Sequence, residues 1–271
     1  APDKVRDIMS KPEFSACLEW LFAEPSDVFV DRISRAAEAG FSAFEFWLWS
    51  NKDIDSMFSV AEEHDIAVAG CVAEPMVPLT DPANHERWLA GLEQSIAVAK
   101  RLRAPVLIAQ AGDEIQGADR RSQAEALVIA LRRAAEMLSG TGVRLGLEPL
   151  NTRVDHPGYF LDSTSEAFEV IEKVGRAEVG IVYDLYHSAV MDEPFEETLS
   201  GHVDKIVHVH VADHPGRHEP GSGSVDLVRR LRWLLDNHYA GRIGFEFKPM
   251  TTDHQALAGM RADFERSLAA V

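Results

Sequence analysis

Val-Arg-Leu-Gly-Leu-Glu, residues 143–148, is the first of four short apolar runs that each end in a side chain able to bind a metal ion. The others are Val-Gly-Ile-Val-Tyr-Asp at 179–184, Lys-Ile-Val-His-Val-His at 205–210 and Arg-Ile-Gly-Phe-Glu at 242–246. Their spacing is the length of chain that a strand, a loop, a helix and a return loop consume. We therefore expect four consecutive parallel strands that place four metal-competent residues at one sheet edge: Glu148, Asp184, His210 and Glu246.

The same alternation of strand and helix extends over the whole chain. Strand-like runs are predicted at 14–21, 42–48, 66–73, 104–110, 143–149, 178–184, 205–211 and 242–248. Amphipathic helical patterns lie near 26–39, 52–64, 83–102, 119–139, 164–174, 194–203, 224–238 and 252–269. Eight alternations favour one domain, residues 1–271, folded as a (β/α)8 TIM barrel. An open doubly wound sheet also fits the alternation, but no Gly-x-Gly-x-x-Gly follows a strand, and ligands on four consecutive strands suit closure better.

The composition limits the classes of partner. The 271 residues include 44 acidic and 27 basic side chains, which gives a formal net charge of −17. This charge repels a phosphate backbone, so we expect no nucleic-acid partner. No apolar run approaches membrane-spanning length, and Cys17 and Cys71 lie in apolar runs, as core residues in a reducing compartment do. The prediction is a cytoplasmic protein without a membrane partner, with homo-oligomerisation left open.

The four strand-end residues predict a metal centre. Three carboxylates and an imidazole that converge carry surplus negative charge, which a divalent cation relieves. This donor set suits Mn²⁺ or Mg²⁺ best and also accommodates Co²⁺ or Zn²⁺. Thiolates, which would favour zinc alone, are absent from it.

Other residues near the same edge are candidates for binding substrate or supporting the ligands. His187 is expected on the loop that leaves the sixth strand, beside the metal. Trp47 and Trp49 end the second strand and either wall a pocket or pack inside the barrel. His208 shares the inward face of its strand with His210 and, one layer deeper, is expected to support the ligands or to pack in the core. Weaker candidates near this edge are Glu45 and Glu74.

The loop after the seventh strand, residues 212–223, combines Gly and Pro with charged side chains. Arg217 offers a planar fork for a substrate carboxylate or hydroxyl pair, and Glu219 is predicted beside it at the substrate. The alternative for these two residues is a surface ion pair. Lys248 shares a strand face with Glu246 and is predicted either to receive an anionic substrate or to form a structural salt bridge.

Six motifs occur in order in the second half of the chain: 147–153, 157–161, 183–187, 208–213, 215–221 and 246–249. Together they resemble those of the hydroxypyruvate isomerases, which share the xylose isomerase-like barrel superfamily with the ketose 3-epimerases. The resemblance is dense from Leu145 to Pro249 and thin before it. It implies that the metal ligands are Glu148, Asp184, His210 and Glu246. It further implies that Glu148 and Glu246 are the acid/base pair, and that His187 and Arg217 hold substrate oxygens.

One position departs from the resemblance. The hydroxypyruvate isomerases have Gln where this chain has His210, whereas the ketose 3-epimerases have His. The implied chemistry is proton transfer beside a carbonyl through an enediolate, between Glu148 and Glu246. Return of the proton to the neighbouring carbon isomerises the substrate, and return to the opposite face of the same carbon epimerises it. We therefore expect a metal-dependent isomerase of hydroxypyruvate or a related oxo-acid or sugar, with a ketose 3-epimerase as the alternative.

Two more remote alternatives share the expected fold. A phosphodiesterase of the endonuclease IV kind would have further histidines at early strand ends and a basic DNA-binding face. Here those strand ends carry Trp47, Trp49 and Glu74, and the chain is acidic. A non-catalytic sugar-binding barrel would not need both Glu148 and Glu246.

Overall fold

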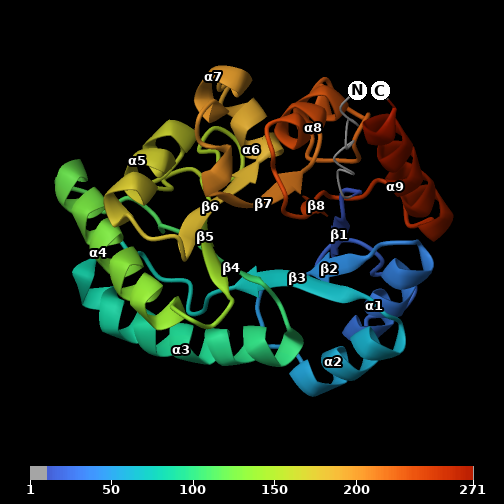
Figure 1. The fold of residues 1–271 in the computed structure, drawn as a ribbon, viewed down its shortest axis with the longest axis horizontal. Helices are drawn as coiled ribbons and strands as arrows, with labels where there is room; N and C mark the ends of the chain where they lie inside the picture. The colour runs from blue at the N-terminus through green and yellow to red at the C-terminus, as the bar shows by residue number, and fades with distance from the viewer. Residues whose placement is uncertain (1–10, 271) are drawn as a thin grey trace, which may run out of the picture.

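In a computed structural model, which describes residues 11–270, neighbouring strands pair in chain order from β1 to β8, and β8 pairs back with β1. All of these pairs are parallel, and the helices surround the ring of strands (Figure 1). The closed (β/α)8 barrel predicted from the alternation is confirmed. The strands are β1 Phe14–Cys17, β2 Ala43–Glu45, β3 Ala67–Val72, β4 Val106–Ala109, β5 Arg144–Leu147, β6 Val179–Asp184, β7 Ile206–Val211 and β8 Ile243–Phe245.

The helices follow the predicted pattern through most of the chain. They are α1 Phe29–Glu38, α2 Ile54–Glu63, η1 Pro82–Asn84, α3 His85–Leu102, α4 Arg120–Leu138, α5 Thr164–Val174, α6 Leu185–Val190, α7 Phe195–Leu199, η2 Val203–Lys205, α8 Leu227–Asp236 and α9 His254–Ala269. Side-chain caps begin several of them: Ser163 accepts a hydrogen bond from the Glu166 N–H, and Asp119 from the Ser122 N–H. Two glycines follow helix ends: Gly40 after α1 and Gly140 after α4, with positive φ angles of 85° and 75°.

The segment after β6 differs from the prediction. One helix was expected at 194–203, but α7 ends at Leu199, and the additional helix α6 begins directly after β6. The Asp184 carboxylate accepts backbone N–H hydrogen bonds at the start of α6, which explains the early beginning. Pro194 then disfavours helical backbone at the residue before it, so α6 and α7 remain separate.

Apolar side chains fill both sides of the strand ring. The larger core packs the strands against the helices, and its fully buried members include Phe44, Leu107 and Phe245. A separate cluster, Val106, Ile108, Val182 and Val207, contains only strand residues, which places it on the inner side of the barrel. Gly146 gives this cluster room, because a Cβ there would lie 2.6 Å from a methyl carbon of Val182. The barrel interior is therefore filled below the site.

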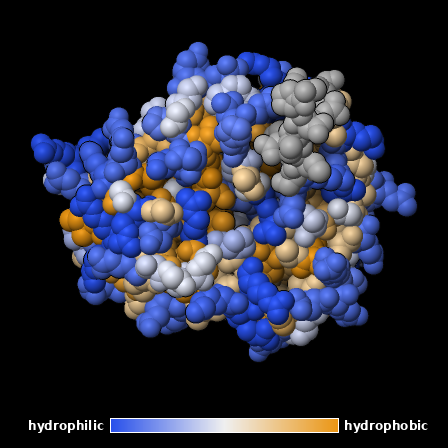
Figure 2. All heavy atoms as spheres, viewed as in Figure 1, coloured by the Kyte–Doolittle hydropathy of each residue, from blue (hydrophilic) through white to orange (hydrophobic). Residues whose placement is uncertain are grey.

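Cys17 and Cys71 are buried and unpaired, and burial raises the pKa of both thiols, which fits the predicted core role. Hydrophilic residues cover most of the face shown in Figure 2, with hydrophobic patches mainly nearer its middle. Among the helices of residues 11–270, none is both long and apolar enough to cross a membrane.

Candidate metal centre and active site

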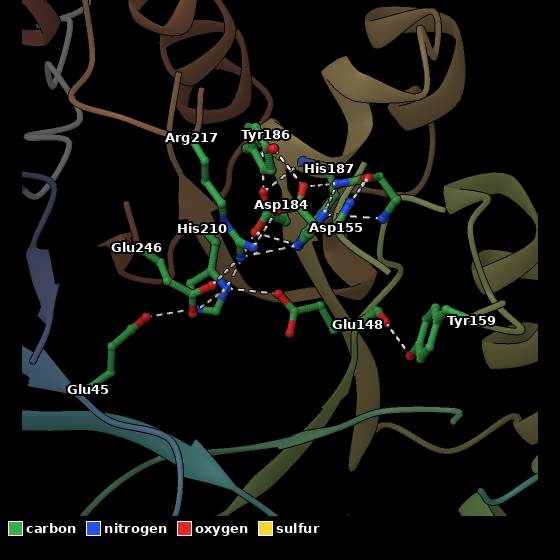
Figure 3. A network of polar contacts seen from close by, with 11 residues as sticks. Glu45, Glu148, Asp155, Tyr159, Asp184, Tyr186, His187, His210, Arg217 and Glu246 are labelled. Carbon is green, nitrogen blue, oxygen red and sulfur yellow. Dashed lines mark hydrogen bonds and ion pairs between the residues drawn. The ribbon is translucent and has the colours of Figure 1, made fainter. Parts of the chain in front are cut away.

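Three carboxylates and one imidazole meet at the carboxyl edge of strands β5 to β8. Glu148 directly follows β5, and Asp184 is the last residue of β6. His210 lies near the end of β7, and Glu246 directly follows β8. All four are buried, and one donor atom of each lies within 4.8 Å of the donor atoms of the other three (Figure 3). The spacing of strand ends in the sequence thus identified side chains that the fold brings together.

His210 presents its two ring nitrogens to different carboxylates. Nδ1 lies 2.9 Å from Glu148 Oε1, 3.6 Å from Glu246 Oε2 and 3.8 Å from Asp184 Oδ2. Nε2 lies 2.6 Å from Glu45 Oε1 on the opposite side of the ring. A histidine that binds a metal usually directs its other N–H to a carboxylate or carbonyl. Nδ1 is therefore the candidate ligand atom, and the Glu45 carboxylate is the charged partner beside Nε2.

Glu45, the last residue of β2, joins the two histidines of β7. Its Oε2 lies 2.6 Å from His208 Nε2 and accepts a hydrogen bond from Ser15 Oγ at 3.1 Å. A Cβ at Gly244 would lie 2.7 Å from this carboxylate and 2.8 Å from the His208 ring, so glycine leaves the necessary space. His208 thus lies beneath the ligands as predicted. The sequence ranked Glu45 only as a weaker candidate, although its place at a strand end was the available signal.

Asp184 uses its two oxygens for different purposes. Oδ1 accepts hydrogen bonds from the backbone N–H groups of Tyr186 and His187, at 2.8 and 3.0 Å, and so caps α6. Oδ2 points toward His210 Nδ1. The cap fixes the carboxylate plane, which leaves one oxygen positioned for a cation.

His187 lies in the first turn of α6 and is buried, rather than on an open loop as the sequence suggested. Its Nδ1 accepts a hydrogen bond from the Asn151 N–H at 3.1 Å, and Asn151 Nδ2 lies 2.7 Å from the same atom. The Asn151 amide is oriented by its own Oδ1, which accepts from the N–H groups of Val154 and Asp155. With Nδ1 occupied as an acceptor, Nε2 carries the proton and faces Asp184 Oδ2 at 3.7 Å. His187 can therefore donate a hydrogen bond into the site.

Arg217 reaches into the site from the loop after β7. One guanidinium nitrogen donates to Glu246 Oε1 at 3.0 Å, and another to Asp155 Oδ1 at 3.4 Å. The guanidinium carbon lies 4.9 Å from the ring centroid of Trp20 and 5.1 Å from that of Tyr186. Arg217 therefore pairs with Glu246 and Asp155, and the alternative expectation of an ion pair with Glu219 is wrong.

Asp213 anchors the loop that carries Arg217. Its carboxylate accepts from the N–H groups of His214, Gly221 and Val225, which ties both ends of the loop together. Arg217 itself has φ = 62°, in the left-handed region that non-glycine residues seldom adopt. A fixed loop with local backbone strain holds the guanidinium over the cluster.

The charges of the cluster shift its pKa values in different directions. Without a bound cation, burial raises the pKa of Glu246 to about 7, with Glu148 adding to the effect and His210 opposing it. For Asp184, burial is outweighed by the neighbouring cationic groups, and its pKa is lowered. For His210, burial is outweighed by the surrounding carboxylates, and its pKa is raised. The surplus of acid groups thus holds extra protons, which a divalent cation would replace.

A cavity of about 360 Å³ opens above the cluster, and Glu148, Arg217 and Glu246 line its inner end. Trp47 lines this cavity, which was one of its two expected positions. The Trp49 indole instead donates a hydrogen bond to Ser95 Oγ at 3.0 Å. Trp20, which the sequence reasoning missed, also lines the cavity; its signal was an aromatic residue just after the first strand.

The remaining candidates lie at the edge of the site or outside it. Glu219 Oε1 accepts the Met250 N–H at 2.7 Å, and Lys248 is exposed, with its ammonium 5.7 Å from the Trp20 ring centroid. The described residues that line this cavity include neither Glu219 nor Lys248. Glu74 accepts the N–H groups of Trp49 and Ser50, which is a structural role.

Comparisons with known proteins show which families the chain resembles. The family model for the xylose isomerase-like TIM barrel matches residues 33–267. A putative hydroxypyruvate isomerase from Homo sapiens is 31% identical over 271 aligned positions, covering 95% of this chain and 97% of that protein. The hydroxypyruvate isomerase of Escherichia coli K12 is 31% identical over 254 positions, covering 91% and 97%. Among solved structures, an AP endonuclease, family 2, from Brucella melitensis has a TM-score of 0.85 and 28% identity, covering 93% of this chain and 98% of that one.

Proposed function

The chain belongs to the xylose isomerase-like TIM barrel family and is an isomerase, and we propose that it isomerises a small hydroxy-oxo acid of the hydroxypyruvate type with one divalent cation. The observation that carries the proposal is the meeting of four buried donor groups within 4.8 Å at the inner end of a cavity. A binding protein would need the cavity, but it would not need two glutamates beside the reacting carbons.

The donor set fits a hard divalent cation. Glu148, Asp184 and Glu246 supply carboxylate oxygens and His210 supplies Nδ1, which suits Mn²⁺ or Mg²⁺ and also accommodates Co²⁺ or Zn²⁺. Within the described residues, Arg217 is the only arginine or lysine side chain paired with this cluster, so the acid groups exceed the fixed positive charge. When bound, the cation supplies Lewis acidity that stabilises negative charge developing on substrate oxygens.

Glu246 and Glu148 are the proposed proton carriers. Glu246 has one oxygen held by Arg217 and the other facing the cluster, a position from which its carboxylate can act as a general base. One glutamate takes a proton from the hydroxyl-bearing carbon, and the electron pair of that C–H bond forms the enediolate. A proton then returns to the former carbonyl carbon while the hydroxyl proton leaves its oxygen, so the carbonyl has moved by one carbon.

His187 and Arg217 are the proposed oxygen holders. The His187 Nε2–H donates into the site, and its pKa is lowered by burial, which favours the neutral ring. The guanidinium of Arg217 stands beside Glu246, where it can pair with the carboxylate of an oxo-acid as well as with the glutamate. Both groups position a substrate relative to the two glutamates.

A ketose 3-epimerase remains the second candidate, because His210 occupies the position where the hydroxypyruvate isomerases have Gln. The endonuclease alternative is weaker. The AP endonuclease structure shares the barrel and 28% of aligned residues, but a net charge of −17 opposes binding to a phosphate backbone. We propose a small-molecule substrate and no nucleic-acid partner.

The test is metal removal and restoration. The purified protein is treated with EDTA, and Mn²⁺, Mg²⁺, Co²⁺ or Zn²⁺ is added back singly. Conversion of hydroxypyruvate and of free ketoses is followed by NMR in D₂O, where isomerisation, epimerisation and C–H exchange give different products. Loss of hydroxypyruvate conversion with EDTA and its return with Mn²⁺ are expected. Full activity without metal would refute the metal-centred proposal, conversion of ketoses alone would favour the epimerase, and cleavage of abasic-site DNA would favour the endonuclease.

A further inference from the structure

The cavity above the metal centre is larger than hydroxypyruvate requires. Its volume is about 360 Å³. Hydroxypyruvate has seven non-hydrogen atoms, and even if each filled the roughly 30 Å³ of a water molecule in the liquid, the acid would occupy only about 210 Å³. Room for several additional atoms therefore remains beyond the reacting carbons.

The cavity lining combines two kinds of side chain. Glu148, Arg217 and Glu246 are charged. A larger group is apolar, and we call it the apolar wall: Trp20, Trp47, Leu48, Val72, Met76 and Ile108. Gln110 and His156 are the two other polar residues among the described residues that line the cavity. A sugar chain would place several hydroxyl groups against carbon atoms there, without hydrogen-bond partners.

The apolar wall is a built surface with fixed aromatic rings. Trp20 and Trp47 contact each other edge to face, with ring centroids 5.0 Å apart. The backbone N–H of Trp47 donates to Glu19 Oε1 at 3.2 Å, and the guanidinium of Arg217 lies against Trp20. Met76, by contrast, is 53% exposed, so an apolar ligand group would cover surface that water now contacts.

We propose that the substrate is a 3-hydroxy-2-oxo acid whose C3 carries an apolar substituent of two or more carbons, and that this substituent rests on the apolar wall. The inference rests on the proposed function, because it assumes that the hydroxy-oxo acid end reacts at the glutamates. The reaction is unchanged: the C3 proton leaves, the C2 carbonyl becomes a hydroxyl-bearing carbon, and the substituent ends beside the new C3 carbonyl. Length and apolarity of the substituent are the specificity determinants.

The first experiment is a substrate series with the Mn²⁺-loaded enzyme. The acids carry hydrogen, methyl, ethyl or propyl at C3, and a hydroxymethyl compound matches ethyl in its number of non-hydrogen atoms. Each methylene buried against the wall should raise kcat/KM about fourfold. Ethyl should therefore exceed hydrogen by about an order of magnitude, and hydroxymethyl should lag well behind ethyl.

The outcomes separate the inference from the proposed function. Two results would overturn the inference but leave the proposed function intact. In the first, hydroxypyruvate is turned over but kcat/KM falls along the alkyl series. In the second, the hydroxymethyl compound has the same kcat/KM as the ethyl compound. Turnover of none of the acids overturns the proposed function, and the inference with it.

The second experiment compares Trp47→Ala with Trp49→Ala. Trp49 is an equally large residue nearby, but its indole binds Ser95 instead of lining the cavity. The measured quantity is the ratio of kcat/KM for the ethyl and hydrogen acids, which does not depend on the fraction of enzyme that folds. Trp47→Ala should lower this ratio about tenfold, while Trp49→Ala should leave it near the parent value. Equal ratios in the two variants would overturn the assignment of the wall.

Discussion

Glu45→Gln tests the support of the metal centre from outside the ligand set. The change removes one negative charge but keeps the shape of the side chain that lies 2.6 Å from both His208 and His210. A glutamine can accept from only one of these rings and must present its NH₂ group to the other. If the NH₂ group faces His210, it favours the proton on Nδ1, where the lone pair is needed for the cation. If it faces His208, a buried ring loses its acceptor.

Removal of such a supporting carboxylate typically weakens metal binding by about 10- to 100-fold, or roughly 1.4–2.7 kcal/mol. We expect this loss in Mn²⁺ affinity, measured by titration calorimetry on the EDTA-treated protein. Glu74→Gln is the matched control, because Glu74 also follows an early strand but accepts backbone N–H groups away from the cluster. Circular dichroism checks that both variants fold. A folded Glu45→Gln protein with the parent Mn²⁺ affinity would refute the role of Glu45.

Three further predictions concern the site residues directly. Glu246→Gln should lower kcat by at least about a hundredfold, the scale of losing a positioned general base, and a variant with near-normal turnover would show that Glu246 is neither base nor ligand. Arg217→Met should weaken kcat/KM for an acid substrate more than Arg217→Lys, because Lys keeps the charge but not the planar fork; equal effects of the two changes would argue against a carboxylate partner. The pKa of Glu246 is about 7 in the metal-free fold and about 4.3 in the unfolded chain, so binding of this proton stabilises the fold at low pH. The contribution to stability is complete below about pH 4.3 and is lost as pH rises through about 7. The melting temperature of the EDTA-treated protein should therefore fall from pH 5 to 7.5, and less so for Glu246→Gln, whereas parallel curves would contradict the assigned pKa.

The meeting of the four proposed metal ligands was predictable because these residues obey a local rule. Glu148, Asp184, His210 and Glu246 each end an apolar run, and parallel strands in a closed barrel bring such ends together. The fold followed from the same alternation. These features depend on short segments and on topology, both of which are visible in sequence.

Contacts across the barrel were not predictable in the same way. Glu45 and its partner His208 are 163 positions apart, and nothing local to β2 indicates which strand it faces. A prediction that Trp20 lines the cavity would have required knowledge of how the turn after β1 folds back over it. The helix boundaries after β6 depended on whether Asp184 would act as a cap, which a ligand prediction alone does not reveal.

The double use of Asp184 constrains how this barrel can diverge. One oxygen begins α6 and the other faces the cluster, so losing the carboxylate would damage a helix as well as a ligand set. Among residues 11–270, the Glu246 side chain makes no hydrogen bond to a backbone group. In a lineage released from selection for catalysis, Glu246 would drift first and Asp184 would persist. In a descendant barrel that kept Asp184 but lost the other three acidic or histidine side chains of the cluster, the aspartate would therefore indicate common ancestry and would not indicate catalytic activity.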